Sequence, residues 1–143
     1  MKPKILVYLV MILSSLTLLS CDKTSELGLL NQKIDELVDA AENHKLIDIK
    51  GILASDFKTA KNLNKTQFLI FVNHQFKRNK SISISVLDKE IRFNEKNADV
   101  IFKVLLLGSS DWLPERGQTY TVTSRWKKEN GDWVMSRLRW NIK

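Results

Sequence analysis

The sequence predicts an α+β fold in which three N-terminal helices pack on a curled, four-stranded antiparallel sheet. From Leu27 to Lys80 the apolar residues of the predicted helices recur every three or four positions, as on one face of a helix, and beyond Lys80 they recur every second position, as in half-buried strands. Asn130-Gly131 separates the last two apolar segments, and this dipeptide is typical of a two-residue hairpin turn. Because the helices precede the strands without alternation, we expect them on one face of the sheet.

The three helices are predicted from their apolar spacing and their capping residues. The first spans Leu27 to Glu42, with Ser25 as its N-cap. The second is short and has Asp48 as its N-cap. The third begins after Asn64, whose side chain forms a capping box with Gln67 three residues later.

The four strands are expected at residues 82–93, 100–107, 119–128 and 133–142. The first strand has an irregularity near Asp88, where the alternation of apolar and polar residues is interrupted. Asn94 to Asn97 forms the turn to the second strand, and the longest loop runs from Gly108 to Gly117. Asn130-Gly131 joins the last two strands.

Composition limits the classes of function. The chain has 143 residues, enough for one domain, and 43% of them are hydrophobic. A single cysteine excludes an internal disulfide framework, and one Cys with two scattered His argues against an all-protein zinc site. No glycine-rich phosphate loop follows a predicted strand, so no cofactor is expected. The net charge is +7, but the basic residues are dispersed, which indicates a solvated surface and not a nucleic-acid interface.

The N-terminal residues resemble the signal peptide of a bacterial lipoprotein. Two lysines precede an apolar run, Ile5 to Leu13. The apolar stretch is short for a membrane-spanning helix, which needs about 20 residues. Leu18-Leu19-Ser20-Cys21 resembles the lipobox, in which small residues precede a cysteine. The resemblance implies cleavage after Ser20 and attachment of a diacylglycerol to the thiol of Cys21.

This resemblance divides the chain into a lipoprotein signal peptide (residues 1–20), a lipidated tether (21–25) and a single domain (26–143). The resemblance implies a location in the bacterial cell envelope, with the domain facing the periplasm. The lipid on Cys21 would anchor it to a membrane, because acyl chains contribute about 0.8 kcal/mol per buried CH2. Asp22 resembles an inner-membrane retention signal, but that rule varies between bacteria, so the sequence does not decide between the inner and the outer membrane. The alternative is a plain signal anchor with an incidental cysteine.

The domain resembles the nuclear-transport-factor-2-like superfamily, which includes SnoaL-like and ketosteroid-isomerase-like proteins. A long helix, then a short one that leads to Asp56-Phe57, matches the usual opening of the family. Arg125 to Met135, with Asn130-Gly131-Asp132-Trp133 at its centre, matches the usual final hairpin. The resemblance covers nearly all of residues 26–142. It implies a sheet that curls around the helices and encloses a pocket.

Enzymatic members of that superfamily place carboxylates, histidines or tyrosines in the pocket as acid and base. In this chain the candidates are Asp56 and His74, which would serve an isomerase, cyclase or dehydratase. Asp56 also suits a turn or a cap, and His74 lies near the polar side of the third helix. His44, just past the first helix, is expected to be exposed. Exposure of all three would exclude this form of the enzyme hypothesis.

The last hairpin holds the candidate ligand-binding residues. If the turn has no bulge, Ser124 pairs with Arg137 and Val122 with Arg139, which puts both arginines on one face with Tyr120 and Trp126. Guanidinium groups among aromatic rings could hold a carboxylate or a phosphate. A single bulge would reverse the assignment, and both arginines would then lie on the outer face.

Trp112, in the long loop, either caps the pocket or folds back onto the core. The leading hypothesis is a membrane-tethered, non-enzymatic domain that binds a small apolar or anionic ligand, or a partner protein of the envelope. The family resemblance also implies a homodimer formed through the outer sheet face as one candidate assembly.

Overall fold

The structure is a computed structural model that describes residues 22–109 and 117–142. The chain divides between Gln32 and Lys33 into two units, and all five strands belong to the second. Two residues with predicted roles, Cys21 and Trp112, lie outside the described residues. No helix in the described part is long and apolar enough to cross a membrane.

Three helices are present, as predicted: α2 (Asp22–Glu42), α3 (Leu46–Ile52) and α4 (Lys65–Arg78). Two predicted caps are wrong, because Ser25 lies inside α2 and Asp48 lies in the first turn of α3. The capping box of α4 is confirmed. Asn64 Oδ1 accepts a hydrogen bond from Gln67 N at 3.0 Å, and Gln67 Oε1 accepts one from Asn64 N at 3.0 Å.

The sheet has five strands, one more than predicted, in the order β1-β5-β4-β3-β2. They are β1 (Leu53–Thr59), β2 (Ser81–Phe93), β3 (Asn97–Ser109), β4 (Gln118–Glu129) and β5 (Asp132–Ile142). The additional strand is β1, which pairs in parallel with β5, whereas the other strands pair antiparallel. An irregularity between Leu53 and Lys58 removes the regular alternation that identifies a strand in a sequence.

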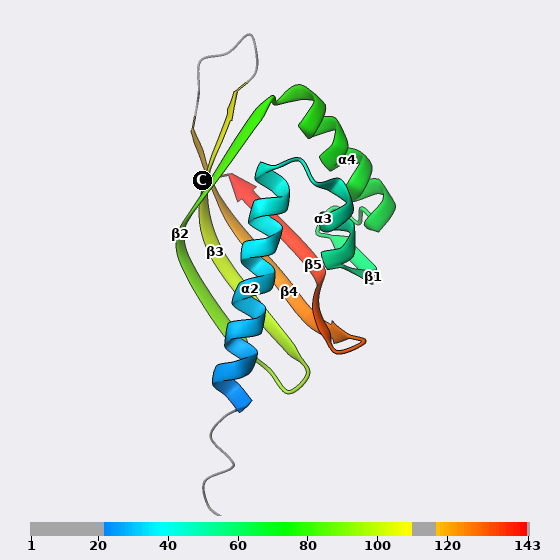
Figure 1. Ribbon diagram of the computed structural model, residues 1–143, viewed down its shortest axis with the longest axis vertical. Helices are drawn as coiled ribbons and strands as arrows, with labels where there is room; N and C mark the ends of the chain where they lie inside the picture. The colour runs from blue at the N-terminus through cyan, green and yellow to red at the C-terminus, as the bar shows by residue number, and fades with distance from the viewer. Residues whose placement is uncertain (1–21, 110–116, 143) are drawn as a thin grey trace, which may run out of the picture. The chain divides into compact units, whose positions relative to one another are not determined.

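Within the second unit, α3, α4 and the part of α2 that begins at Lys33 pack on one face of this curved sheet (Figure 1). Phe68 of α4 contacts Phe57 of β1 and Trp140 of β5, with ring centroids 5.1 and 6.3 Å apart. Three inward side chains of the central strands are fully buried: Trp126, Val100 and Ala98. The α+β class and the segregation of helices to one face are therefore confirmed.

Two β-bulges set the direction of the side chains along the sheet. In β2 the register shifts between Val86 and Asp88, which confirms the irregularity predicted there. In β5 the register shifts at Ser136, because Arg125 pairs with Arg137 whereas the next residue, Trp126, pairs with Met135. Ser136 is the extra residue, and its hydroxyl donates to the carbonyl of Arg125 at 3.2 Å.

The hairpin between β4 and β5 is confirmed. Asn130 and Gly131 have φ angles of 52° and 86°, so both occupy the left-handed region that the two central residues of a type I′ turn require. The turn fixes the pairing of the first residues of β5, and the bulge at Ser136 changes it further along the strand.

Candidate functional site

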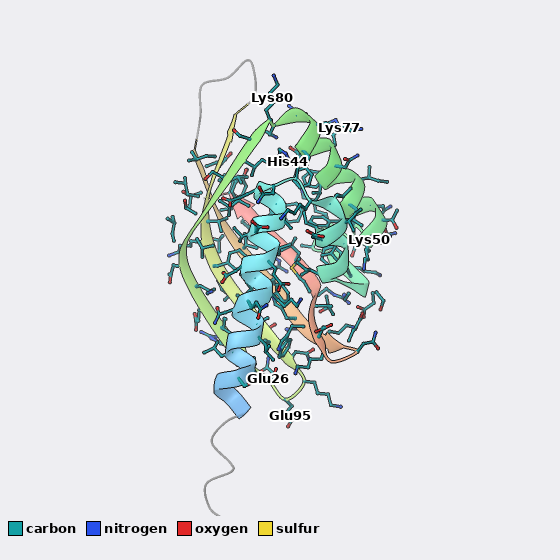
Figure 2. The ribbon with its side chains drawn as sticks, in the orientation of Figure 1. Glu26, His44, Lys50, Lys77, Lys80 and Glu95 are labelled. Carbon is teal, nitrogen blue, oxygen red and sulfur yellow. The ribbon has the colours of Figure 1, made fainter. Side chains whose placement is uncertain are left out.

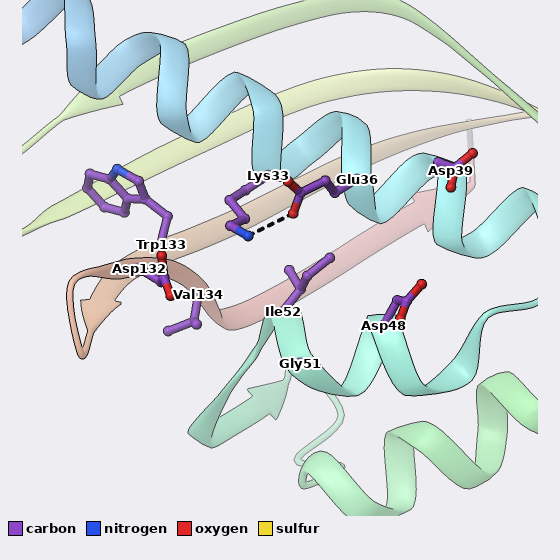
Figure 3. Close-up of a pocket in the computed structure, with 9 residues that line it drawn as sticks. All are labelled: Lys33, Glu36, Asp39, Asp48, Gly51, Ile52, Asp132, Trp133 and Val134. Atoms are coloured by element: carbon purple, nitrogen blue, oxygen red, sulfur yellow. Dashed lines mark hydrogen bonds and ion pairs between the residues drawn. The ribbon is translucent and has the colours of Figure 1, made fainter.

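A cleft of about 370 Å³ lies between the second half of α2, α3 and the start of β5 (Figure 3). We call it the acidic cleft. Its lining consists of five charged residues, one glycine and three apolar residues. The charged residues are Lys33, Glu36, Asp39, Asp48 and Asp132, and the others are Gly51, Ile52, Trp133 and Val134. All of these residues belong to the second unit of the chain.

The apolar wall of the acidic cleft is part of the core. Ile52, Trp133 and Val134 are each at most 7% exposed. Trp133 also contacts Phe93, with ring centroids 5.9 Å apart, so β2 supports the wall from behind. Because these side chains are fixed by packing, the wall is preformed, and the small part of each that stays exposed forms the apolar side of the cleft.

The charged rim is more exposed. Lys33 Nζ lies 2.7 Å from Glu36 Oε2, and this ion pair projects over the cleft (Figure 3). Asp39 pairs with Lys45 at 2.9 Å. Asp48 and Asp132 are exposed. With four carboxylates and one ammonium group, the rim disfavours an anion, so the anionic option predicted from the sequence does not fit this cleft.

The acidic cleft holds groups suited to binding. Its described lining has no imidazole, thiol or hydroxyl group. Within the described ranges 22–109 and 117–142, no group of three His, Cys, Asp or Glu side chains is arranged to hold a metal ion. Three of its four carboxylates, Asp39, Asp48 and Asp132, are exposed.

The predicted ligand-binding residues lie on two different faces of the sheet. The bulge at Ser136 makes Ser124 pair with Leu138 and Val122 pair with Trp140, so the bulge-free pairing of these residues with Arg137 and Arg139 is wrong. Residues that pair directly across strands share a face. The two arginines therefore point outward.

Tyr120 and Trp126 point inward. Trp126 is fully buried, and its Nε1 donates to Ser124 Oγ at 2.9 Å, so its polar group already has a partner in the core. Tyr120 is half-buried, and its hydroxyl lies 3.3 Å from Gln118 Oε1. The structure therefore does not assemble the four residues into one site, and their ligand-binding role stays a prediction.

Asp56 is exposed on β1 and is held in an ion pair. Its Oδ1 lies 3.0 Å from Nζ of Lys127, and this hydrogen-bonded cation lowers the pKa of Asp56 below its ordinary value. A carboxylate with a lowered pKa binds a proton weakly, so Asp56 is a poor general base at neutral pH. His74 is exposed on α4.

His44 differs from the prediction that it is exposed. It follows the end of α2 (Figure 2), has a φ angle of 55° and is half-buried. Its ring centroid lies 4.7 Å from that of Phe76, and its Nε2 is buried with no hydrogen-bond partner among the described residues. The short loop between α2 and α3 explains the burial, because it turns the side chain back towards α4.

The residues of the acidic cleft were not found from the sequence. The polar face of the first predicted helix contains Glu36 and Asp39, and this concentration of acidic residues was the available signal. Asp132 and Trp133 follow the hairpin turn, about 80 residues or more from α3 in the chain. Only the pairing of β5 with β1, which continues directly from α3, brings them beside Ile52.

Comparison with known proteins identifies the fold. No protein-family model matches the chain, and no curated protein matches it. Solved structures do. A LinA-type3 hexachlorocyclohexane dehydrochlorinase from Novosphingobium barchaimii is 15% identical, with a TM-score of 0.75 over 85% of this chain and 89% of that one.

Two further structures are similar. An NTF2-like superfamily protein from Salmonella enterica is 11% identical, with a TM-score of 0.70 over 79% of this chain and 87% of that one. An uncharacterised protein with a cystatin-like fold from Caulobacter vibrioides is 11% identical, with a TM-score of 0.69 over 81% and 88%. At these identities the similarity shows the fold alone, so the chain has the nuclear-transport-factor-2-like fold that its sequence predicts.

Proposed function

We propose that this chain is a membrane-tethered lipoprotein of the bacterial cell envelope, whose domain binds a small ligand with an apolar body and does not transform it. The lipobox at Leu18 to Cys21 supports the tether. The observation that carries the binding function is the preformed apolar wall of the acidic cleft, Ile52, Trp133 and Val134, inside a space of about 370 Å³. That volume lies within the range of about 300–1,000 Å³ typical of small-molecule sites.

Native mass spectrometry of the chain purified gently from its own host tests the binding function. We expect a small molecule that co-purifies with the protein and is lost on denaturation. The variant Gly51→Phe places a large side chain in the lining of the cleft, where an added Cβ meets no atom within 4 Å. This variant should lose the ligand.

Gly28→Phe is the matched control. Gly28 also lies in a helix, also has open space around it and does not line the cleft. Retention of the ligand by both variants would place the ligand elsewhere. Absence of any ligand in the unaltered protein would count against the binding function and favour a partner protein.

The tether is tested separately by the mass of the mature chain. We expect cleavage after Ser20 and a mass increase that corresponds to a diacylglycerol on Cys21. Cys21→Ala should leave the chain unlipidated and its signal peptide uncleaved. An unmodified thiol in the unaltered protein would reject lipidation and leave the cleft hypothesis unaffected.

His44 favours one second candidate, an enzyme of the isomerase, cyclase or dehydratase kind. Its buried Nε2 has no hydrogen-bond partner in the described part of the chain, so a ligand that reached this nitrogen would meet an unengaged proton acceptor or donor. The same mass spectrometry separates the two functions. A ligand that loses water or rearranges during incubation with the protein, but not with His44→Gln, would establish the enzyme.

A further inference from the structure

A row of charged side chains crosses all five strands on the outer face of the sheet. The cross-strand partners are, in order from β1 to β2, Lys58, Arg137, Arg125, Asp99 and Arg92. Four of the five are cations, and the three at the β1 end are adjacent. Like charges directly opposite each other destabilise a sheet. The row is therefore not explained by the stability of the fold.

Most of the charge on this face is neutralised locally. Five carboxylates of this face lie within 4 Å of a cation: Asp99 with Arg125 at 2.7 Å, Asp56 and Glu129 with Lys127 at 3.0 and 3.3 Å, Glu90 with Arg92 at 2.7 Å, and Asp88 with Lys103 at 3.8 Å. Among the described residues no such ion pair joins a carboxylate to Lys58, Arg137 or Arg139. These three cations lie together on β1 and β5, and we call them the basic edge.

The basic edge is exposed and partly held in place. Lys58, Arg137 and Arg139 are all exposed. Nη1 of Arg137 donates to the carbonyls of Asp56 and Ser136 at 3.1 and 2.8 Å, which orients the exposed guanidinium group through one of its three nitrogens. A guanidinium group in this state is prepared to bind a phosphate oxygen.

We propose that the basic edge docks on the anionic phospholipid surface of the membrane to which the chain is tethered. The basic edge lies on an open sheet face and does not line the acidic cleft, so it suits an extended charged surface better than a small free anion. A second copy of the chain would present the same cations and be repelled. The inference rests on the proposed tether, which raises the local concentration of lipid phosphate at the domain.

The test uses the full chain reconstituted in vesicles, with a fluorescent amino acid in place of Thr123. This residue is exposed and pairs directly with Arg139, so it reports on the basic edge without the use of cysteine. Phosphatidylcholine vesicles are compared with vesicles that also contain phosphatidylglycerol, and both carry a trace of headgroup spin-labelled lipid as a quencher. We expect stronger quenching in the anionic vesicles.

Arg137→Gln/Arg139→Gln should abolish most of this difference. Each basic residue near an anionic surface contributes about fivefold to the docking constant, which corresponds to about 1 kcal/mol, so the double variant should dock about 25-fold more weakly. Arg92→Gln/Lys103→Gln removes the same charge from the same face at two ion-paired positions. This control should dock as the unaltered protein does.

Equal quenching in both kinds of vesicle would overturn the proposal, as would equal losses in the two double variants. Salt provides a second readout, because the Debye length falls from about 10 Å at 0.1 M to about 3 Å at 1 M and docking should fall with it. Lipidation is read independently from the intact mass of the same preparation. A lipidated chain with no docking rejects the basic edge alone, and an unlipidated chain rejects the tether.

Discussion

The carboxylate of Glu42 accepts a hydrogen bond from the backbone N–H of Ile84, with 2.7 Å between Oε1 and N. Glu42 is the last residue of α2, and Ile84 lies on β2, the strand at the edge of the sheet. The edge of a sheet presents backbone groups without a strand partner. The end of α2 therefore satisfies one of these groups and joins the helix to the sheet where β2 would otherwise be open.

Removal of this carboxylate should destabilise the domain. A hydrogen bond to a charged group contributes about 1.5–3 kcal/mol, so Glu42→Ala should lower the free energy of unfolding by about that amount in urea denaturation. Glu42→Gln keeps an acceptor oxygen and should lose less. Asp35→Ala changes an exposed carboxylate on the same helix and serves as control. Equal losses for Glu42→Ala and the control would contradict the role assigned to Glu42.

Stability should fall in acid because three carboxylates on the sheet have lowered pKa values: Asp99, which is hydrogen-bonded to Arg125, and two that contact Lys127. A hydrogen bond from Lys127 lowers the pKa of Asp56 from 3.8, and one from Ser55 lowers that of Glu129 from 4.5. A lowered pKa contributes stability above the unfolded pKa, and this contribution is lost as the pH falls through the folded value. Urea midpoints should therefore decline below a pH of about 4.5.

Lys127→Met should reduce this acid dependence. The variant removes the cation that contacts Asp56 and Glu129, so less stability remains to be lost when they are protonated. Lys50→Met, at an exposed position of α3, should leave the acid dependence as it is in the unaltered protein. The prediction fails if the two variants show the same decline in urea midpoint between neutral pH and acid.

Two glycine substitutions should have opposite signs. Gly131→Ala puts a side chain at a φ angle of 86° and should cost about 1–2 kcal/mol. Gly51→Ala is in α3 with open space around the new methyl group and should add about 0.5–1 kcal/mol. Thermal melts of both variants measure this, and a stabilising Gly131→Ala would show that the turn is not of type I′.

Trp126 should behave as a core residue. It is fully buried, so Trp126→Ala should cost about 3–5 kcal/mol of stability. Trp140 lies on the same face but is only half-buried, and Trp140→Ala should cost less. Chemical denaturation of both variants tests this order. A small cost at Trp126 together with loss of a bound ligand would restore its predicted role in binding.

The structural features that can be predicted from the sequence are those that a few neighbouring residues determine. Asn130-Gly131 and the Asn64–Gln67 capping box have strict backbone requirements, and both were predicted. Ser136 fits an ordinary strand, so nothing in its neighbourhood indicated a bulge. The sequence therefore allows both directions for Arg137 and Arg139, inward without a bulge and outward with one.

The candidate site was less predictable than the fold. The acidic cleft combines residues from α2, α3 and β5, and its existence depends on the pairing of β1 with β5. That pairing is parallel and joins residues about 80 positions apart, so no local alternation or turn signal indicates it. His44 was misjudged for a related reason, because its burial depends on Phe76 of α4.

The extra residue in β5, Ser136, reverses the order in which the side chains of this strand alternate between the inner and the outer face of the sheet. Before Ser136 the odd-numbered side chains point inward, and after it the even-numbered ones do. A deletion of this single residue would exchange the two sets beyond it, so that two guanidinium groups would enter the core and Leu138 and Trp140 would leave it. Substitutions can only change one of these side chains at a time. The number of residues in β5 thus determines which of its side chains face the apolar core and which face outward. Single-residue insertions and deletions should therefore be the changes that this strand tolerates least.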